Sequence, residues 1–387
     1  MNLNPATNIP VFYTSDALSF EKQADDILIQ LKQKERIMRL VFFGETEEQN
    51  YEQELASLKQ RLIRIWGEEH PLLTYITQPV LGSKRLAAEV HYQLEEFSKI
   101  RPVFKQMNDI RYILLEDKDK KILLTEGVRK GDSISTAGTQ SKKIFEEIEA
   151  ILSTENFNIR DIVRQWNYIE NITGFKDGIQ NYQALNDARS VFYGNTEWSE
   201  GGYPAATGIG MEYGGIIVEL IAIQAKNNYT NIYPIDNPRQ IAAHSYSQDV
   251  LLGKEDRILK EKSTPKFERA KAVSTPTGYT CFISGTAAIR GELSLEEMDG
   301  AQQTELTIEN IEHLISINNI RKTGMPATNH GKLDTIRVYI KDPKDYPEIH
   351  RKVESYWPSV PALYVKADIC RTELLVEIEG IAQNRYQ

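Results

Sequence analysis

The feature that most constrains the fold of this chain is an order of predicted elements that occurs three times along it. In the last copy, alternating apolar residues predict a strand at 334–340, helical spacing predicts a helix at 345–356, and two extended segments follow before residue 382. The same order of strand, helix, strand and strand is predicted within residues 36–94 and 162–225. This repetition of one supersecondary unit predicts a fold built from three similar parts.

The closing strand of each copy carries a glutamate at the matching place: Glu89, Glu219 and Glu377. Each copy combines an amphipathic helix with a mixed sheet, which is the pattern of an α+β domain. A length of 387 residues suits two or three domains of ordinary size. We therefore predict an α+β protein with three domains, at 1–100, 101–235 and 236–387. The Gly-, Ser- and Thr-rich segment 131–143 is predicted to be a connecting loop.

The composition excludes several classes of function. A formal net charge of -9 and a pI near 5.4 argue against a surface that binds a phosphate backbone, so no nucleic-acid partner is expected. The two cysteines, Cys281 and Cys370, are too few for a disulfide framework or a thiolate-rich zinc site. The six histidines lack the spacing of a metal-binding motif, so we expect no metal site.

Neither a signal peptide nor a membrane span is predicted. Residues 1–5 lack the basic and apolar regions of a signal peptide. The longest apolar stretch, 216–225, contains Glu219 and is too short to cross a bilayer. We therefore expect a soluble, cytoplasmic protein without a membrane partner.

Two groups of residues near the C-terminus match a known family pattern. The first group is a strand that contains Ser-Gly, then a glycine turn, then a helix that carries glutamine and asparagine. The matching residues here are Ile283-Ser284-Gly285-Thr286 in the strand, Gly291 in the turn, and Gln303 and Asn310 on the helix. The second is the terminal strand Glu377-Ile378-Glu379-Gly380-Ile381-Ala382. Over 279–382 the chain resembles the Rid (YjgF-like) family. The resemblance implies a chorismate-mutase-like fold and trimers with sites between subunits, so three copies in one chain imply a covalent pseudo-trimer that is a monomer in solution.

Further motifs cover much of the remaining chain. They are Trp166-Asn167-Tyr168-Ile169, Asn181-Tyr182 with Asn186, Ala188-Arg189, Phe192-Tyr193, the run 203–210, Phe267 with Arg269-Ala270, and the run 368–377. In these motifs the chain is similar to the chorismatase family, which cleaves chorismate to pyruvate and a ring acid. The ring acid differs between subtypes: a dihydroxycyclohexadiene acid, 3-hydroxybenzoate or 4-hydroxybenzoate. Residues 1–100 match only through the repeat pattern.

The sequence departs from these families at two places. Gly291-Glu292 stands where a Gly-His pair is usual, and Leu363 and Tyr364 stand where Rid proteins carry an arginine after Pro361. That arginine anchors a carboxylate, so its absence argues against a Rid-like enamine or imine deaminase. A non-catalytic, metabolite-binding Rid-type protein is the second alternative, but it leaves the cluster of cysteine, arginine and glutamates within 370–377 unexplained.

Glu377 is the leading candidate for catalysis. Releasing pyruvate from chorismate breaks an enol ether, and protonating its methylene carbon gives an oxocarbenium ion that fragments or takes up water. A carboxylic acid held near neutral pKa by burial supplies that proton. From spacing alone, a structural glutamate on an interface strand is the commoner case, and the family resemblance favours the catalytic role. Such chemistry implies no metal and no organic cofactor.

Cys370, seven residues before Glu377, is expected to line the pocket beside the acid, because the resemblance associates a cysteine here with hydroxybenzoate products. Without the resemblance, a free cysteine is usually a small buried hydrophobe. Gly285 is expected at a close backbone approach, and the family places a small residue there that helps to set the product. Both residues favour an aromatic product but leave 3- and 4-hydroxybenzoate open.

Chorismate carries two carboxylates, and arginine binds carboxylates in a bidentate geometry. The candidate anchors lie within the resemblance motifs: Arg189, Arg269 and Arg371. The candidate hydrogen-bond donors to the substrate are three tyrosines: Tyr193, Tyr203 and Tyr246. Any one of these arginines could instead form a salt bridge, and most of the 19 tyrosines are expected to be core residues. We therefore predict a chorismatase that holds this small-molecule substrate through several of these side chains.

Overall fold

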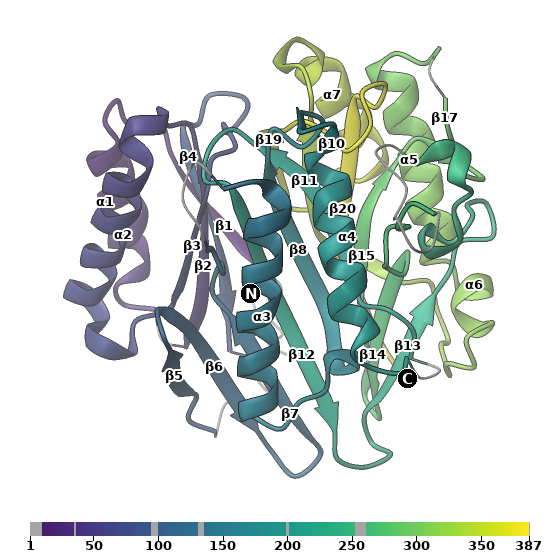
Figure 1. Cartoon of the computed structure of the whole chain (residues 1–387), viewed down its shortest axis with the longest axis horizontal. Helices are drawn as coiled ribbons and strands as arrows, with labels where there is room; N and C mark the ends of the chain where they lie inside the picture. Colours follow the sequence, from purple (N-terminus) through teal and green to yellow (C-terminus); the bar gives the residue numbers. More distant parts are fainter. Residues whose placement is uncertain are drawn as a thin grey trace.

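Three β-sheets organise the chain, which Figure 1 shows as a computed structural model. The structure describes residues 10–34, 36–93, 100–130, 135–198, 201–251, 261–295 and 297–386. The first sheet has the strand order β1-β4-β2-β3. Its strands are β1 (Val11–Ser15), β2 (Ile37–Gly44), β3 (Leu72–Ile76) and β4 (Leu86–Tyr92).

The second and third sheets have six strands each, in the orders β11-β8-β12-β7-β6-β5 and β13-β14-β15-β20-β18-β19. The second contains β5 (Val103–Met107), β6 (Ile110–Glu116), β7 (Lys120–Thr125), β8 (Ile162–Glu170), β11 (Ala205–Met211) and β12 (Ile216–Ala225). The third contains β13 (Asn231–Ile235), β14 (Ala270–Thr275), β15 (Gly278–Ala287), β18 (Lys332–Ile340), β19 (Ala362–Lys366) and β20 (Val376–Arg385).

The same three-strand unit occurs in all three sheets, as the units β4-β2-β3, β12-β8-β11 and β20-β18-β19. In each unit the middle strand runs antiparallel to the first and parallel to the third. A parallel pair needs a crossover connection, and each unit has an α-helix there: α2 (Tyr51–Trp66), α4 (Asn181–Gly194) and α7 (Tyr346–Tyr356). The predicted order of strand, helix, strand and strand is therefore present three times.

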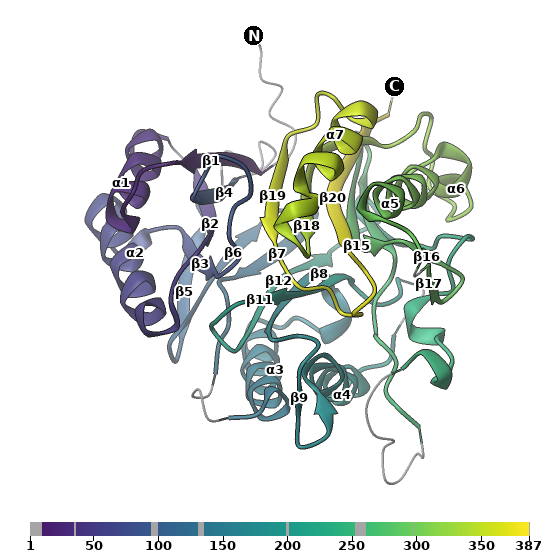
Figure 2. The ribbon, with the colours of Figure 1, turned by 90° about the horizontal axis from the view of Figure 1, so that it is seen from above.

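The helices lie outside and the sheets face a common centre, as the view from above shows (Figure 2). The helices α1 (Phe20–Leu31) and α2 cover the first sheet, α3 (Ala137–Thr154) and α4 cover the second, and α5 (Gly300–Leu314), α6 (Ile317–Arg321) and α7 flank the third. Each sheet thus has an apolar core against its helices. A further core joins the three sheets at the centre and includes Phe43, Trp166 and Tyr339.

The segment 131–143 is not a loop throughout, because α3 begins at Ala137. Thr136 caps this helix by accepting a hydrogen bond from the backbone N–H of Thr139. Buried apolar side chains recur at helical spacing further along, including Ile144, Ile148 and Ile151. Thr136, Gly138 and Thr139, which contributed to the loop prediction, therefore form the cap and first turn of this helix, whereas residues 131–134 lie outside the described part of the chain.

Candidate active site

Strand register places Glu89, Glu219 and Glu377 at equivalent positions in the three sheets. Their partners in the adjacent antiparallel strand are Val41, Trp166 and Tyr339, respectively. Each partner lies two residues after an arginine of the same strand, and these arginines are Arg39, Arg164 and Arg337. All six charged side chains are buried, so the middle of the molecule contains a polar cluster within an apolar core.

A cavity of about 360 Å³ lies between the second and third sheets. Its size is within the usual range for small-molecule sites. The second sheet contributes β11 and the region around the start of α4, and the third contributes β15, β20 and the segments 246–251 and 370–374. Both polar and apolar side chains line it, including Tyr182, Asn186, Tyr246, Phe267, Arg269, Gly285, Ile289, Cys370, Arg371 and Glu377.

Glu377 lies in the wall of this cavity, on β20, and is only 5% exposed. Burial raises the pKa of Glu377 to about 8, and the nearby charge of Glu379 adds to the rise, while Arg164 and Arg269 act against it. Within the described part of the chain, no hydrogen-bond donor contributes to the pKa of this carboxyl group. Glu377 is therefore protonated at neutral pH and accessible to a molecule in the cavity.

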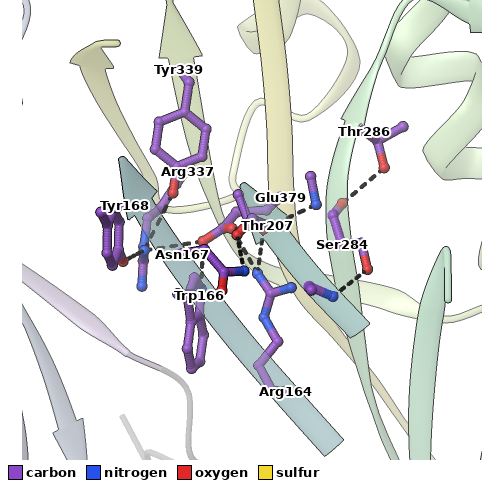
Figure 3. Close-up of polar contacts among 12 residues, drawn as sticks. Arg164, Trp166, Asn167, Tyr168, Thr207, Ser284, Thr286, Arg337, Tyr339 and Glu379 are labelled. Atoms are coloured by element: carbon purple, nitrogen blue, oxygen red, sulfur yellow. Dashed lines mark hydrogen bonds and ion pairs between the residues drawn. The ribbon is translucent and has the colours of Figure 1, made fainter. Parts of the chain in front are cut away.

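Glu379, two residues further along β20, has the opposite environment (Figure 3). Its carboxylate accepts hydrogen bonds from Arg164 (2.6 Å) and Trp166 (3.0 Å), and Thr207 donates a further short one. Arg337 pairs with it at 3.1 Å. These donors compensate for the burial of the Glu379 carboxylate.

Gly285 lets β15 approach the acid closely. A side-chain carbon at this position would overlap the Oε1 atom of Glu377 and lie 3.1 Å from the Cγ2 atom of Thr207. The backbone N–H of Gly285 donates to Thr207 Oγ1 at 3.0 Å, which fixes this approach. The close backbone approach predicted for Gly285 is therefore present.

Cys370 also lines the cavity and forms no disulfide. Burial raises the pKa of its thiol to about 12, and the neighbouring Glu377 adds to this rise. The group is thus a neutral thiol at neutral pH, whereas cysteine acts as a nucleophile through its thiolate. The side chain shapes the cavity beside Glu377.

Arg269, Arg371 and Tyr246 come together in the cavity wall. The Tyr246 ring is close to both guanidinium groups, with its centroid 5.6 Å from the Cζ atom of Arg269 and 5.3 Å from the Cζ atom of Arg371. Arg269 donates to the Tyr246 hydroxyl at 2.7 Å and to the Ile241 carbonyl at 2.6 Å. Its Nε atom is buried and has no partner among the described residues. Two cationic groups therefore face one small cavity.

Arg189, Tyr193 and Tyr203 do not line the cavity. Arg189 is buried behind the wall and donates to the side-chain oxygen of Asn186 at 2.6 Å. The Tyr193 hydroxyl donates to Gln165 at 2.8 Å, and its ring stacks on Tyr203 at a centroid distance of 5.8 Å. Arg189 and Tyr193 thus bond to protein partners and the Tyr203 ring packs on Tyr193, although the Nε atom of Arg189 has no partner among the described residues.

Several lining side chains are not among the candidates predicted from the sequence, including Tyr182, Gln183, Asn186 and Phe267. Tyr182, Asn186 and Phe267 belong to the motifs of the chorismatase resemblance, so that signal was available. On α4, Asn186 and Arg189 are three residues apart and share one helix face. The motif alone did not show which of the two reaches the cavity.

The interface between the first and second sheets is equivalent to the interface between the second and third, but a tyrosine stands there in place of a cavity-lining glycine. Thr74 accepts a hydrogen bond of 2.9 Å from the backbone N–H of Gly127, just as Thr207 accepts one from the backbone N–H of Gly285. The next residue is Tyr75 at the first interface and Gly208 at the second. The Tyr75 ring stacks on Tyr51 at a centroid distance of 5.6 Å. A side-chain carbon on Gly208 would lie 2.7 Å from the Tyr182 ring, so glycine at this position keeps the cavity open.

The described part of the chain offers neither a membrane span nor a metal centre. None of its helices combines the length and the apolar character needed to cross a bilayer. Its His, Cys, Asp and Glu side chains form no group of three that could hold a metal ion.

Comparison with known proteins gives one consistent family. A family model described as chorismatase FkbO/Hyg5-like, N-terminal, matches residues 109–222. A 3-hydroxybenzoate synthase of Streptomyces hygroscopicus is 32% identical over 235 residues, which are 59% of this chain and 65% of that relative. A chorismatase of the same organism is 29% identical over 223 residues, which are 57% of this chain and 61% of that relative. These matches span less than two thirds of either relative.

A solved chorismatase structure covers 96% of this chain and 97% of its own, with a TM-score of 0.71 and 21% sequence identity. That similarity shows a shared α+β fold across nearly the whole length, including the first sheet, where the sequence motifs are absent. In sequence the chain is similar to chorismatases over these segments, and it shares the fold of a solved chorismatase.

Proposed function

We propose that this protein cleaves chorismate into pyruvate and a hydroxybenzoate, with Glu377 as the acid that protonates the enol ether. The observation that carries the proposal is a buried carboxyl group, with its pKa raised to about 8, in a cavity that two guanidinium groups also face. Similarity to chorismatases supports chorismate as the substrate. Neither relative is similar enough to assign the product.

The proposed step begins with transfer of the Glu377 proton to the methylene carbon of the enolpyruvyl group. The resulting oxocarbenium ion is opposite in charge to the newly formed Glu377 carboxylate and to Glu379, which favours its formation. For 4-hydroxybenzoate, the bond between ring carbon C3 and the ether oxygen then breaks, pyruvate leaves with that oxygen, and the ring cation loses the hydrogen at C4 as a proton, which returns to Glu377. For 3-hydroxybenzoate, water adds to the oxocarbenium ion and gives its proton to Glu377, the hemiketal breaks into pyruvate and a ring that keeps both oxygens, and that ring loses its C4 hydroxyl as water. On either route the acid is regenerated and no net water is consumed.

Arg269 and Arg371 are the proposed anchors of the two carboxylates, with Tyr246 in contact with both of them. Both arginines line the cavity, and the Nε–H group of Arg269 has no hydrogen-bond partner among the described residues. Arg189 is proposed to act indirectly, because its hydrogen bond orients Asn186 in the wall. Tyr193 and Tyr203 are proposed to support α4 and β11 from behind.

Cys370 and Gly285 are proposed to select an aromatic product. Both border Glu377, so they determine which part of the substrate ring lies next to the acid. The relative described as a 3-hydroxybenzoate synthase supports a hydroxybenzoate product. The proposal covers both the 3- and the 4-isomer.

The proposed architecture is three chorismate-mutase-like (Rid/YjgF-like) repeats that form a pseudo-trimer within one chain, at 1–100, 101–235 and 236–387. It is supported by the three equivalent strand units, each of which falls within one of these segments. Because the repeats cover one another around a common centre, we expect a monomer of 44.3 kDa in light scattering. A stable trimer would contradict this architecture.

The test of the proposed function is incubation of the purified protein with chorismate. Pyruvate is measured with lactate dehydrogenase, and the ring acid is separated from both hydroxybenzoate standards by chromatography. The proposal predicts equal amounts of pyruvate and one hydroxybenzoate. Absence of pyruvate, or its release with an unaromatised diene acid, would contradict it. Unchanged activity after treatment with EDTA is also expected, because the step needs no metal.

A further inference from the structure

Glu292 joins two parts of the cavity wall that are far apart in the sequence. It lies in the turn between the short strands β16 (Ile289–Arg290) and β17 (Leu293–Ser294), after Gly291, whose φ of 59° suits such a turn. Its carboxylate accepts two hydrogen bonds from Ser247, one from the backbone N–H and one from the hydroxyl, each 2.7 Å long. Hydrogen bonds to a charged acceptor are about twice as strong as neutral ones.

Ser247 directly follows Tyr246 and precedes the lining residues Asp249, Val250 and Leu251. The two bonds from Ser247 therefore fix the segment that brings Tyr246 to the cavity. The turn is itself anchored, because the backbone N–H of Ile241 donates to the Gly291 carbonyl at 2.8 Å.

The backbone of Glu292 holds the second part of the wall. Its carbonyl oxygen accepts a hydrogen bond from the Arg371 guanidinium at 2.9 Å, and Ser294 Oγ accepts another at 3.0 Å. The same guanidinium packs on the Tyr246 ring, and the Tyr246 hydroxyl accepts from Arg269. Glu292 thus connects Ser247, Tyr246, Arg371 and Arg269 into one set of contacts.

We infer that Glu292 is a positioning residue for the dicarboxylate site: it holds Tyr246 in contact with Arg269 and Arg371 before the substrate arrives. The inference rests on the proposed function, because it takes the two arginines as carboxylate anchors. Preorganised side chains lose less conformational entropy on binding, so their effect is on substrate affinity. Glu292 itself is not needed for proton transfer, since Glu377 supplies the proton.

The experiment compares Glu292→Ala and Glu292→Gln with a matched control, Glu309→Gln. Glu309 binds Arg290 of the same hairpin at 2.6 Å but does not line the cavity. Loss of a charged acceptor is expected to raise KM for chorismate roughly tenfold or more in Glu292→Ala, with kcat changed less than about threefold. The milder Glu292→Gln keeps one acceptor oxygen and is expected to raise KM less. Glu309→Gln should keep the wild-type KM.

Hydrogen–deuterium exchange of residues 241–251 provides a second readout that does not depend on turnover. Glu292→Ala is expected to speed exchange in this segment, and Glu309→Gln is not. A wild-type KM and wild-type exchange in both Glu292 variants would overturn the inference, as would a loss of kcat at unchanged KM. If the wild-type protein releases no pyruvate, the proposed function fails, while the exchange experiment still decides whether Glu292 holds the segment.

Discussion

Glu377 and Glu379 are two residues apart on β20 and have opposite environments. Glu379 accepts hydrogen bonds from Arg164, Thr207 and Trp166, which compensate for its burial. Glu377 faces the cavity, where burial and the charge of Glu379 raise its pKa to about 8. A buried carboxyl group with a raised pKa is characteristic of a general acid.

The charge of Glu379 provides the first prediction. In Glu379→Gln that charge is removed, so the pKa of Glu377 should fall. Pyruvate release requires protonated Glu377, so kcat should be constant at low pH and decline above about pH 8 in the wild type, with the decline shifted to lower pH in the variant. A profile of kcat against pH measures the shift.

Glu219→Gln is the control for this variant, because Glu219 is an equally buried glutamate, at the register position of the second sheet that corresponds to Glu377. Both variants are expected to lower the melting temperature, since each disturbs a buried polar cluster. Only Glu379→Gln should move the pH profile. An unmoved profile in an active Glu379→Gln protein would contradict the electrostatic role of Glu379.

The raised pKa of Glu377 also predicts a pH dependence of stability. In the unfolded chain its carboxyl group ionises near 4.5, whereas in the folded protein it stays protonated up to about 8. Between these values the folded state binds the extra proton, so this residue's contribution to the free energy of unfolding declines as pH rises, by up to about 1.4 kcal/mol per pH unit. Glu377→Gln cannot titrate and should lack this decline. Urea unfolding at pH 5 and pH 8 tests it, and equal pH dependence in both proteins would count against the raised pKa.

Gly208 provides a steric prediction. In Gly208→Ala the added carbon would lie 2.7 Å from the Tyr182 ring, so the ring should move into the cavity. We expect kcat/KM to fall roughly tenfold or more, mainly through KM, because the space for substrate shrinks. Gly194→Ala is the control, since no atom lies within 4 Å of a carbon added there. Wild-type kinetics in Gly208→Ala would show that this space is not used by the substrate.

Much of the fold was predictable from the sequence pattern, but which individual side chains reach the cavity was not. The apolar run 216–225 coincides with β12, and the helix predicted at 345–356 matches α7 to within one residue, because both have a strong period. The helix α3 was missed because its first turn contains Gly, Ser and Thr. The family motif predicted Arg189 in the site. In the structure Asn186, about one helical turn earlier, lines the cavity, and Arg189 lies behind the wall.

Cys370 tests whether the thiol takes part in the chemistry. Because its pKa is raised to about 12, the thiol is neutral, and Cys370→Ala should release pyruvate at a rate within about tenfold of the wild type. The ratio of ring products is expected to change, because the cavity beside Glu377 becomes larger. Cys281→Ala, in the core of the third sheet, should leave the product ratio unaltered. Complete loss of pyruvate release in a folded Cys370→Ala protein would assign the thiol a catalytic role.

The most direct test of the central claim is the turnover of Glu377→Gln, measured together with its melting temperature at pH 7. Glutamine keeps the shape of the side chain but cannot protonate carbon, so pyruvate release should fall by roughly 10²–10⁴-fold, the usual contribution of a general acid. The melting temperature should not decrease, because the protonated acid and the amide pack alike. Near-normal pyruvate release from a destabilised Glu377→Gln protein would show that Glu377 is a structural residue and would contradict the account.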